Sequence, residues 1–437
     1  MRLKSILYTV AIATSVFTAT AQDENLTPLE QVQQKVETHD VTISKLNNLK
    51  ITGYIQPQYQ WGEESAALRV GTANTDATKS FNRIGIRRGR LKFTYDAGEL
   101  ASGVFQLNII DKPGLSGATV QLKEAYLNVK APWLKTSALR AGIFDRPFGN
   151  EISYSSSLLE SPERSRIINQ LFPEETDLGG MLVLQPAATS SFNFLKFEGG
   201  LFAGNAINPE TDNRKDFIGH IVATKPIGNT ARWGLGASYY NGGVYQTTAK
   251  VYSMSDGGFA ANTSDENIGQ FAKREYIGFD GQLSFESPVG MTQLRGEYIW
   301  GTQPGSSSST ASPNRSSIPS GANAYDTYLR PMNGWYAILV QDIGQIPFSA
   351  VVKYDVYDPN TSVSGNEVGS AYSGGASTSK ADIKYSTLGL GLLWRIHPSV
   401  RLQAYYELVK NETTSALAAF TSDQKDNTFT LRLQYKF

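Results

Sequence analysis

The amino-acid sequence predicts an all-β fold, a transmembrane antiparallel β-barrel of about 16 strands preceded by a short periplasmic coiled-coil helix. Three observations predict it. Apolar and polar residues alternate in segment after segment, the connections are alternately short and long, and the mature chain lacks the run of about 18 apolar residues that a transmembrane helix needs. In the last ten residues the apolar face is Phe429, Leu431, Leu433, Tyr435 and Phe437, and the polar face is Thr428, Thr430, Arg432, Gln434 and Lys436.

A strand with one apolar face fits two classes of protein. A soluble β-protein turns that face inward, whereas a membrane barrel turns it outward to lipid and keeps the polar face for the lumen. Charged residues in the middle of strands separate the two classes, as with Arg295 and Glu297, or Arg401 and Glu407. A soluble sandwich rarely buries opposed charges in this way, so the pattern favours a membrane barrel.

The composition narrows the classes of function. Lys plus Arg and Asp plus Glu both number 40, so there is no excess of positive charge for a nucleic-acid partner. The chain has no cysteine, which excludes disulfides, thiolate metal sites and thiol nucleophiles. No cluster of metal ligands is visible, and we expect no cofactor. Generous Gly, Tyr and Phe with a mean hydropathy of −0.29 are typical of a barrel whose lumen residues dilute the hydropathy.

The N-terminus predicts export. Arg2 and Lys4 precede an apolar run over residues 6–17, and Ala-Thr-Ala at 19–21 is a small-residue cleavage site. Residues 1–21 are therefore expected to be a signal peptide. No cysteine follows the site, so the chain is not expected to be a lipoprotein. Export of a β-barrel predicts the outer membrane of a Gram-negative bacterium, with outer-membrane lipid as a partner.

Residues 22–49 are predicted to form a periplasmic helix. Thr27, Pro28 and Glu30 make a capping-box start. Apolar positions then follow at spacings of three and four, which is a heptad seam: Leu29, Val32, Val36, His39, Ile43 and Leu46. We favour a coiled coil supported by a trimeric body; the alternative is one amphipathic helix lying against the barrel mouth. His39 is expected to be a tolerated polar layer rather than a pH-sensitive or metal-binding one.

Residues 50–437 are predicted to form the barrel. Short turns, such as those at 96–99, 226–229 and 397–399, alternate with long polar connections, such as those at 61–81, 144–178 and 302–331. An even number of strands places both ends of the barrel on the side of the short, periplasmic turns. The expected strands are 50–60, 82–95, 100–109, 119–130, 136–143, 179–186, 195–204, 215–225, 231–241, 275–286, 290–301, 332–342, 346–357, 384–396, 399–410 and 427–437.

One predicted strand is rich in arginine. Its two apolar faces have opposite parity on either side of Arg88 and Gly89, so a β-bulge is expected there. With that slip, Arg83, Arg87, Arg90 and Lys92 all face the lumen. A column of cations on a channel wall would bind and pass anions, since guanidinium groups match oxyanions. The alternative, which the sequence leaves equally open, is that these cations pair with lumen acids and brace the barrel.

The long connection after the fifth predicted strand is the second candidate. Porins fold their third loop into the lumen at this position. Its charges are mixed, which suits a transverse field across a constriction, with acids on the loop facing arginines on the wall. The candidate constriction residues are Arg146, Glu151, Glu163, Arg164 and Arg166.

Motifs over residues 83–180 resemble the phosphate-selective porin O/P family. They are Arg-Arg-Gly-Arg at 87–90, Lys-Glu-Ala-Tyr-Leu-Asn-Val at 123–129, Leu-Arg-Ala-Gly-Ile-Phe at 139–144 with Pro-Phe-Gly at 147–149, Glu-Arg-Ser at 163–165 and Asp-Leu-Gly at 177–179. The resemblance implies a trimeric barrel of 16 strands that passes small solutes, often anions, through an arginine-lined constriction. The resemblance carries over residue by residue only to the arginine-rich strand, as Arg83, Arg87, Arg88 and Arg90. With Lys92 and Arg140, these residues are the pore-lining candidates.

The leading functional hypothesis is a porin for passive diffusion of small hydrophilic solutes, with a possible preference for phosphate-like anions. An outer-membrane enzyme would need a nucleophile and a base. The only histidines are His39, His220 and His397, and only His220 falls on a predicted strand away from a turn, so we expect no enzyme. The alternative is a structural role in which the N-terminal coiled coil tethers the envelope.

Overall fold

The computed structural model describes residues 46–110, 117–208, 210, 212–311 and 325–437. The chain divides into two compact units, Met1–Leu49 and Lys50–Phe437. The predicted signal peptide, His39 and the predicted helix up to residue 45 lie outside the described residues, so the coiled coil and its trimerisation stay predictions.

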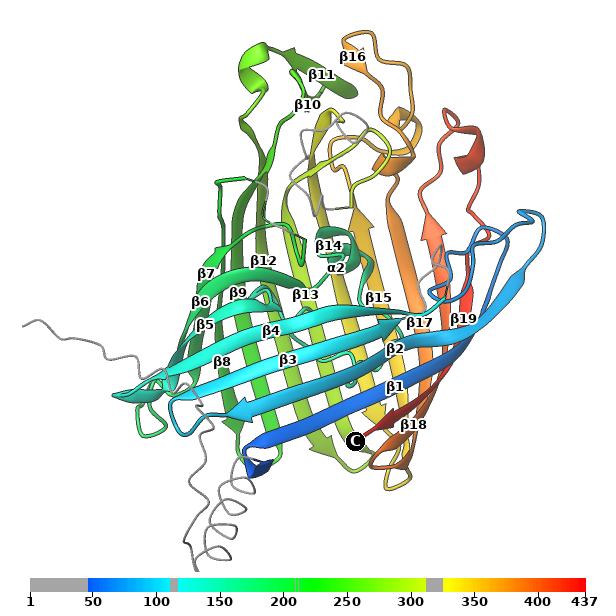
Figure 1. Cartoon of the computed structure of the whole chain (residues 1–437). Helices are drawn as coiled ribbons and strands as arrows, with labels where there is room; N and C mark the ends of the chain where they lie inside the picture. Colours follow the sequence, from blue (N-terminus) through cyan, green and yellow to red (C-terminus); the bar gives the residue numbers. More distant parts are fainter. Residues whose placement is uncertain (1–45, 111–116, 209, 211, 312–324) are drawn as a thin grey trace, which may run out of the picture. The chain divides into compact units, whose positions relative to one another are not determined.

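Sixteen strands of the described residues form a closed antiparallel barrel, as predicted (Figure 1). The sheet closes because β1 pairs with β19 as well as with β2. The strands are β1 (Leu49–Gly62), β2 (Phe81–Asp96), β3 (Ala101–Ile110), β4 (Thr119–Ala131), β5 (Leu134–Asp145), β6 (Thr176–Leu184), β7 (Leu195–Phe202), β8 (Asp216–Ile227), β9 (Ala231–Tyr245), β12 (Phe271–Ser287), β13 (Gly290–Gly305), β14 (Thr327–Asp342), β15 (Phe348–Asp358), β17 (Tyr385–His397), β18 (Val400–Asn411) and β19 (Thr428–Lys436). Each of the 16 predicted segments overlaps one of them.

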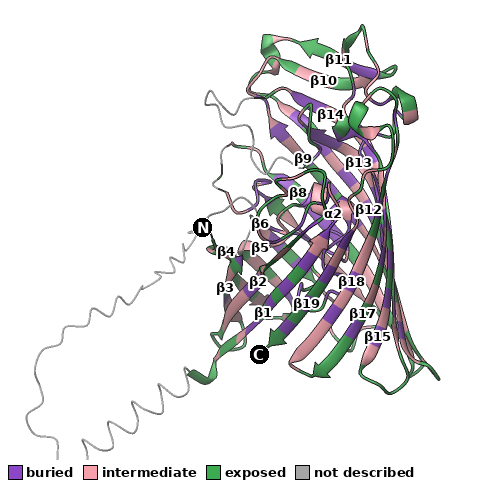
Figure 2. Ribbon diagram, turned by 90° about the vertical axis from the view of Figure 1, so that its right-hand side faces the viewer, coloured by how far each residue is buried: buried purple, intermediate pink, exposed green. Residues whose placement is uncertain are grey.

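Alternation along the strands follows the predicted faces (Figure 2). In β19, Thr430 and Arg432 are each 1% exposed, whereas Leu431 and Leu433 are 37% and 43% exposed. The polar side chains therefore point into the barrel and the apolar ones out of it, as lipid requires. No helix among the described residues is long and apolar enough to cross a membrane.

The chain terminus completes the barrel wall. Gly53 and Phe437 exchange two backbone hydrogen bonds, each 3.0 Å long, where β1 meets β19. A Cβ at Gly53 would lie 2.6 Å from the Phe437 ring, so the close approach requires glycine. Short turns join strands at this end, and long connections such as 63–80 and 359–384 lie at the other end (Figure 1).

Three short strands, which the sequence did not predict, lie within the long connections: β10 (Lys250–Ser255), β11 (Gly258–Thr263) and β16 (Gly375–Ala376). β10 and β11 form a hairpin closed by Asp256 and Gly257, and Gly257 has a φ of +82°. An Asp-Gly pair is a strong two-residue hairpin signal, so this element was readable from the sequence. Single 3₁₀ turns occur at Asp265–Asn267, Gly365–Glu367, Lys380–Asp382 and Ala418–Phe420.

The third long connection, residues 146–175, folds inside the barrel and carries the helix α2 (Arg166–Leu171) (Figure 1). Six of its apolar side chains join a buried cluster with residues of the inner wall. They are Phe148, Ile152, Ile167, Ile168, Leu171 and Phe172. This segment, called the third loop below, therefore packs against the inside of the barrel through a hydrophobic core of its own.

Candidate functional site

Apolar packing anchors one side of the third loop. Phe172 is 2% exposed, and its ring centroid lies 5.2 Å from that of Phe148 and 5.9 Å from that of Tyr276. The wall residues of this cluster come from β5 to β9 and from β12 to β15: Phe144, Met181, Val183, Phe202, Ile218, Tyr240, Tyr276, Ile299, Met332 and Tyr357. This packing fills the lumen on that side, so any passage has to follow the remaining wall.

The start of the loop is held by a wall carboxylate. Glu297 of β13 accepts hydrogen bonds from the backbone N–H groups of Asn150, at 2.6 Å, and of Glu151. The preceding Gly149 has a φ of +60°, and a Cβ there would collide with the Glu297 carboxylate. Glycine is therefore required at this position for the loop to turn inward.

Glu163 is the centre of the charged side of the loop. Arg87 binds it with two hydrogen bonds of 2.8 Å, Arg88 donates another of 2.8 Å, and Arg432 of β19 donates one of 3.0 Å. Burial raises the pKa of Glu163, but the arginines outweigh burial and hold the pKa well below its ordinary value. The consecutive residues Arg87 and Arg88 both reach the interior, which is the departure from strict alternation that the predicted slip describes.

Two further carboxylates of the loop are also paired. Glu175 binds Arg164 of the loop and Lys123 of β4. Burial raises its pKa, yet these cations hold the pKa well below the ordinary value. Glu151 accepts a 2.7 Å hydrogen bond from Lys353 of β15. Ion pairs of these loop carboxylates therefore attach the loop to β2, β4, β15 and β19.

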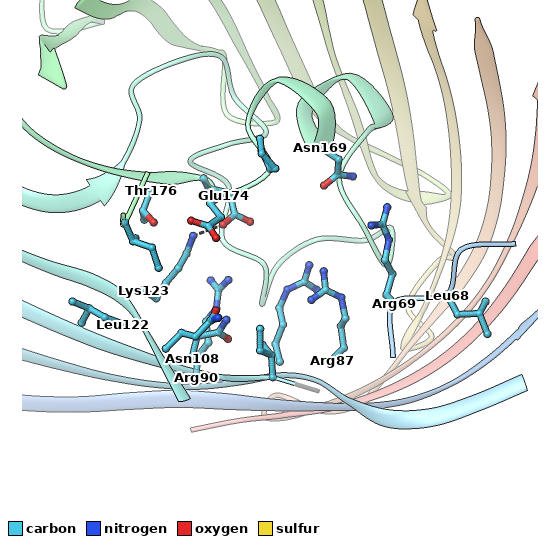
Figure 3. A pocket seen from close by; sticks show the side chains of 16 residues that line it. Leu68, Arg69, Arg87, Arg90, Asn108, Leu122, Lys123, Asn169, Glu174 and Thr176 are labelled. Carbon is cyan, nitrogen blue, oxygen red and sulfur yellow. Dashed lines mark hydrogen bonds and ion pairs between the residues drawn. The ribbon is translucent and has the colours of Figure 1, made fainter. Parts of the chain in front are cut away.

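Described residues of the loop and of the wall line two cavities beside the charged side of the loop. The basic cavity, of about 430 Å³, lies towards β2 to β4 (Figure 3). Its charged lining is Arg69, Arg87, Arg88, Arg90, Lys123, Glu174 and Glu175. The acidic cavity, of about 280 Å³, lies towards β15 to β19 and β1. Its charged lining is Arg69, Arg164, Arg166, Glu163, Asp355, Glu407 and Asp426.

Arg69 lines both cavities, and sequence reasoning missed it. It lies in the first long connection, where Leu68 and Val70 on either side are buried and Arg69 itself is exposed. Its backbone N–H donates a 2.7 Å hydrogen bond to Gln60 of β1. In Figure 3, Arg69, Arg87 and Arg90 point from the first connection and the wall towards Asn169 and Glu174 of the third loop. The alternation of Ala66, Leu68 and Val70 with Ala67 and Arg69 was the available signal.

The structure divides the other predicted residues. Arg87, Arg88, Arg90, Glu163, Arg164 and Arg166 line a cavity, whereas Arg83, Lys92, Arg140 and Arg146 line neither. Arg83 donates to the carbonyl groups of Thr72 and Ala73 in the first connection.

The remaining cations of this set have local partners on the inner wall. Lys92 pairs with Glu124 at 2.7 Å, and Arg146 pairs with Asp177 at 3.1 Å. Arg140 lies over the Tyr126 ring at 4.9 Å. These three side chains brace the wall between β2 and β6.

The two histidines of the described residues lie on or at the end of barrel strands. His220 of β8 lies 2.8 Å from the Asp280 carboxylate of β12, and His397 lies at the end of β17. Within the described part of the chain, no three His, Asp or Glu side chains group closely enough to hold a metal ion.

The architecture defines a class: a closed barrel of 16 strands with an apolar outer face and an inward-folded third loop. Solved structures of similar fold include proteins named as a porin, an outer membrane channel and an outer membrane protein. An anion-selective porin from Comamonas acidovorans has a TM-score of 0.51 and 12% identity, over 89% of this chain and 99% of that one. The outer membrane channel DcaP of Acinetobacter baumannii has a TM-score of 0.53 and 12% identity, over 89% and 97%.

A third similar structure is OmpT, an outer membrane protein of Vibrio cholerae, in a trimer form. It has a TM-score of 0.50 and 9% identity, over 89% of this chain and 99% of that one. At these identities the likeness is one of fold. No protein-family model matches the chain, and no curated protein matches it in sequence.

Proposed function

We propose that the chain is an outer-membrane porin of a Gram-negative bacterium, a passive channel for small hydrophilic solutes. The observation that carries the proposal is the third loop, which is docked inside the barrel and has two charge-lined cavities beside it. A barrel of 16 strands is wide enough for an aqueous channel, and an inward loop narrows it to the size of small solutes. The similar folds of proteins named as porins and channels support the same reading.

We propose further that the channel prefers anions. The basic cavity has five cationic side chains and two carboxylates in its lining. Arg87, Arg88 and Lys123 are bound to carboxylates, whereas no ion pair within the described residues involves Arg69 or Arg90. Arg90 therefore carries anion attraction, with Arg69, while Arg87 and Arg88 hold the loop. We also propose that phosphate is preferred among anions. This part of the proposal follows from the family resemblance.

Reversal potentials across a planar bilayer under a KCl gradient test this proposal. The wild-type channel is expected to select for chloride, and Arg90→Ala is expected to lose about half or more of that selectivity. Arg232→Ala is the matched control, because this exposed arginine of β9 lines neither cavity. Chloride selectivity that Arg90→Ala leaves unchanged would remove the anion preference. Folded protein that shows no channel steps would remove the porin itself.

The proposed assembly is a homotrimer in outer-membrane lipid, as the resemblance implies and as the trimer form of one similar fold supports. Light scattering of the detergent-purified protein, corrected for bound detergent, measures its mass directly. A mass of three chains is expected, and a monomer would contradict the assembly without affecting the channel.

A further inference from the structure

The outer face of the barrel carries a groove of about 500 Å³ over β9, β12, β13 and β14, called the outer groove below (Figure 1). Small residues form its floor: Gly281 of β12 pairs with Gly296 of β13, which pairs with Ala337 of β14. Gly281 also pairs with Leu235 of β9, which is 61% exposed and closes one end. The lipid-facing wall is therefore indented at this place.

Large apolar side chains stand on both sides of this floor. They belong to the next outward-facing positions of the same strands: Leu283, Leu294 and Leu339 on the side of the short turns, and Phe279, Tyr298 and Trp335 on the other side. Phe279 is 54% exposed and Leu294 is 45% exposed, so the two walls project from the barrel. An empty groove would lose the dispersion contacts of its lining, so in a membrane we expect an apolar group to fill it.

A cationic side chain lies beside the outer groove. Lys225 of β8 pairs in register with Trp233 of β9, and Trp233 lines the groove. Lys225 is exposed and shares the outward parity of Ile221 and Ile227. Its Nζ atom lies 5.1 Å from the centroid of the Phe194 ring. Within the described residues, no ion pair includes Lys225, so its charge is available to an anion at the outer face.

The cation and the groove lie at different depths. Lys225 and Trp233 share a row close to the short turn at residues 228–230. Leu235 and Gly281 share the next outward-facing row, which lies about 7 Å further along the strands from that turn. A lysine beside aromatic rings at the border of a barrel is typical of the headgroup region, and the groove lies deeper, among acyl chains.

We propose that the outer groove binds one phospholipid of the periplasmic leaflet, with its phosphate at Lys225 and one acyl chain between the apolar walls. The proposal rests on the outer-membrane location proposed above and is independent of the passage of solutes. A phospholipid joins an anion and a hydrocarbon chain in one molecule, in the order in which Lys225 and the groove follow each other. The apolar outer face of a second copy of this chain would fill the groove without offering an anion to Lys225.

Native mass spectrometry of the detergent-purified protein, titrated with dioleoylphosphatidylglycerol, tests the proposal because it counts bound lipids. The wild type is expected to bind one lipid per chain more tightly than any further lipid. Ala337→Leu places a larger apolar side chain on the groove floor, and it should raise the Kd of that lipid by about tenfold. Lys225→Gln removes the charge at the headgroup, and it should raise the same Kd by about fivefold.

Two controls match these changes elsewhere on the barrel. Ala404→Leu makes the same substitution at an outward position of β18, where Ala404 pairs with the exposed Leu431. Arg232→Gln removes an exposed cation beside Trp233, at a position whose alternation faces the lumen. Both controls are expected to keep the Kd of the wild type. Heat-dependent migration on gels shows that each variant barrel is folded.

The outcomes separate the possible occupants of the outer groove. A Kd unchanged in Ala337→Leu or in Lys225→Gln, or raised equally in the controls, would overturn the phospholipid site. A loss of oligomer mass in Ala337→Leu would assign the groove to contact between copies of the chain and would overturn it as well. Folded wild-type protein that binds the lipid as expected but shows no channel steps would overturn the porin function and support the lipid site.

Discussion

The third loop is held on its two sides by different forces. On one side Phe172, Ile167 and their neighbours pack into an apolar cluster that fills the lumen. On the other side Glu163 and Glu175 bind wall and loop cations around two cavities. Apolar burial depends on area and shape, so it fixes where the loop lies. Each ion pair neutralises two particular side chains. The ion pairs therefore determine which charged side chains remain available to a solute.

The arginines near the third loop differ in their pairing. Three of them, Arg87, Arg88 and Arg432, converge on Glu163, so a column that looks like an anion path is largely structural. Arg69, by contrast, is in no ion pair of the described residues and lines both cavities. The count of arginines on a strand is therefore a poor guide to selectivity, and their pairing is a better one.

Removing the largest apolar contact should have the largest effect. Phe172→Ala is expected to cost about 3–5 kcal/mol of loop docking, because it leaves a cavity between Phe148, Tyr240 and Tyr276. Single-channel conductance should rise and become noisy, and proteases should cut within residues 146–175. Phe192→Ala is the control, since that side chain is 60% exposed in a short turn. Wild-type conductance and protease resistance would show that the apolar side does not hold the loop.

Removing the central carboxylate should have a smaller effect. Glu163→Gln leaves Arg87, Arg88 and Arg432 without their shared anion, at a cost of about 1–3 kcal/mol. This cost is lower than that of a fully buried ion pair, because Arg87 and Arg88 line a cavity that water can reach. Chloride selectivity should increase, since freed arginines then face the lumen.

Glu99→Gln is the control for this charge change. Glu99 pairs with Lys135, and their side chains are 77% and 57% exposed, so their pairing contributes little. Unchanged selectivity in Glu163→Gln would mean that its arginines lie outside the path of ions. Reduced selectivity would contradict the division between bound and available cations.

Acid should break the ion pairs of Glu163, which hold the charged side of the third loop, at an unusually low pH. The pKa of Glu163 is held well below its ordinary 4.5 by Arg87, Arg88 and Arg432 against the effect of burial. Its stabilising contribution is then fully present above about pH 4.5 and is lost as the pH falls through the lower pKa of the folded state. The conductance step that is present in the wild type and missing in Glu163→Gln should lie below pH 4.5. If that Glu163-dependent step lay at or above pH 4.5, it would contradict the pairing.

The smallest expected effect lies in the acidic cavity. Burial raises the pKa of Asp426 to about 6, with Arg166 opposing the rise. The carboxyl group should therefore be charged at pH 7 and largely neutral at pH 5. Cation permeability relative to chloride should fall over that interval by less than about twofold. The change should be missing in Asp426→Asn, and its persistence there would assign it to another group.

The barrel follows from patterns that are local in the sequence. Strand period, turn spacing and long connections are local properties, because alternate side chains must meet lipid and water in every strand. All 16 barrel strands, and the position of the third loop after β5, follow from patterns such as that of β19. The loop's mixed charges were readable as well.

Which of those charges are paired follows from contacts between segments that are far apart in the sequence. Glu163 and Arg432 are 269 residues apart, and no local pattern relates them. Arg69 lines both cavities, and Leu68 and Val70 are buried on either side of it, whereas Arg83 is bound to the same connection. Ion pairing depends on distance in space and on burial, and both arise only when the closed barrel brings its first, third and last connections together.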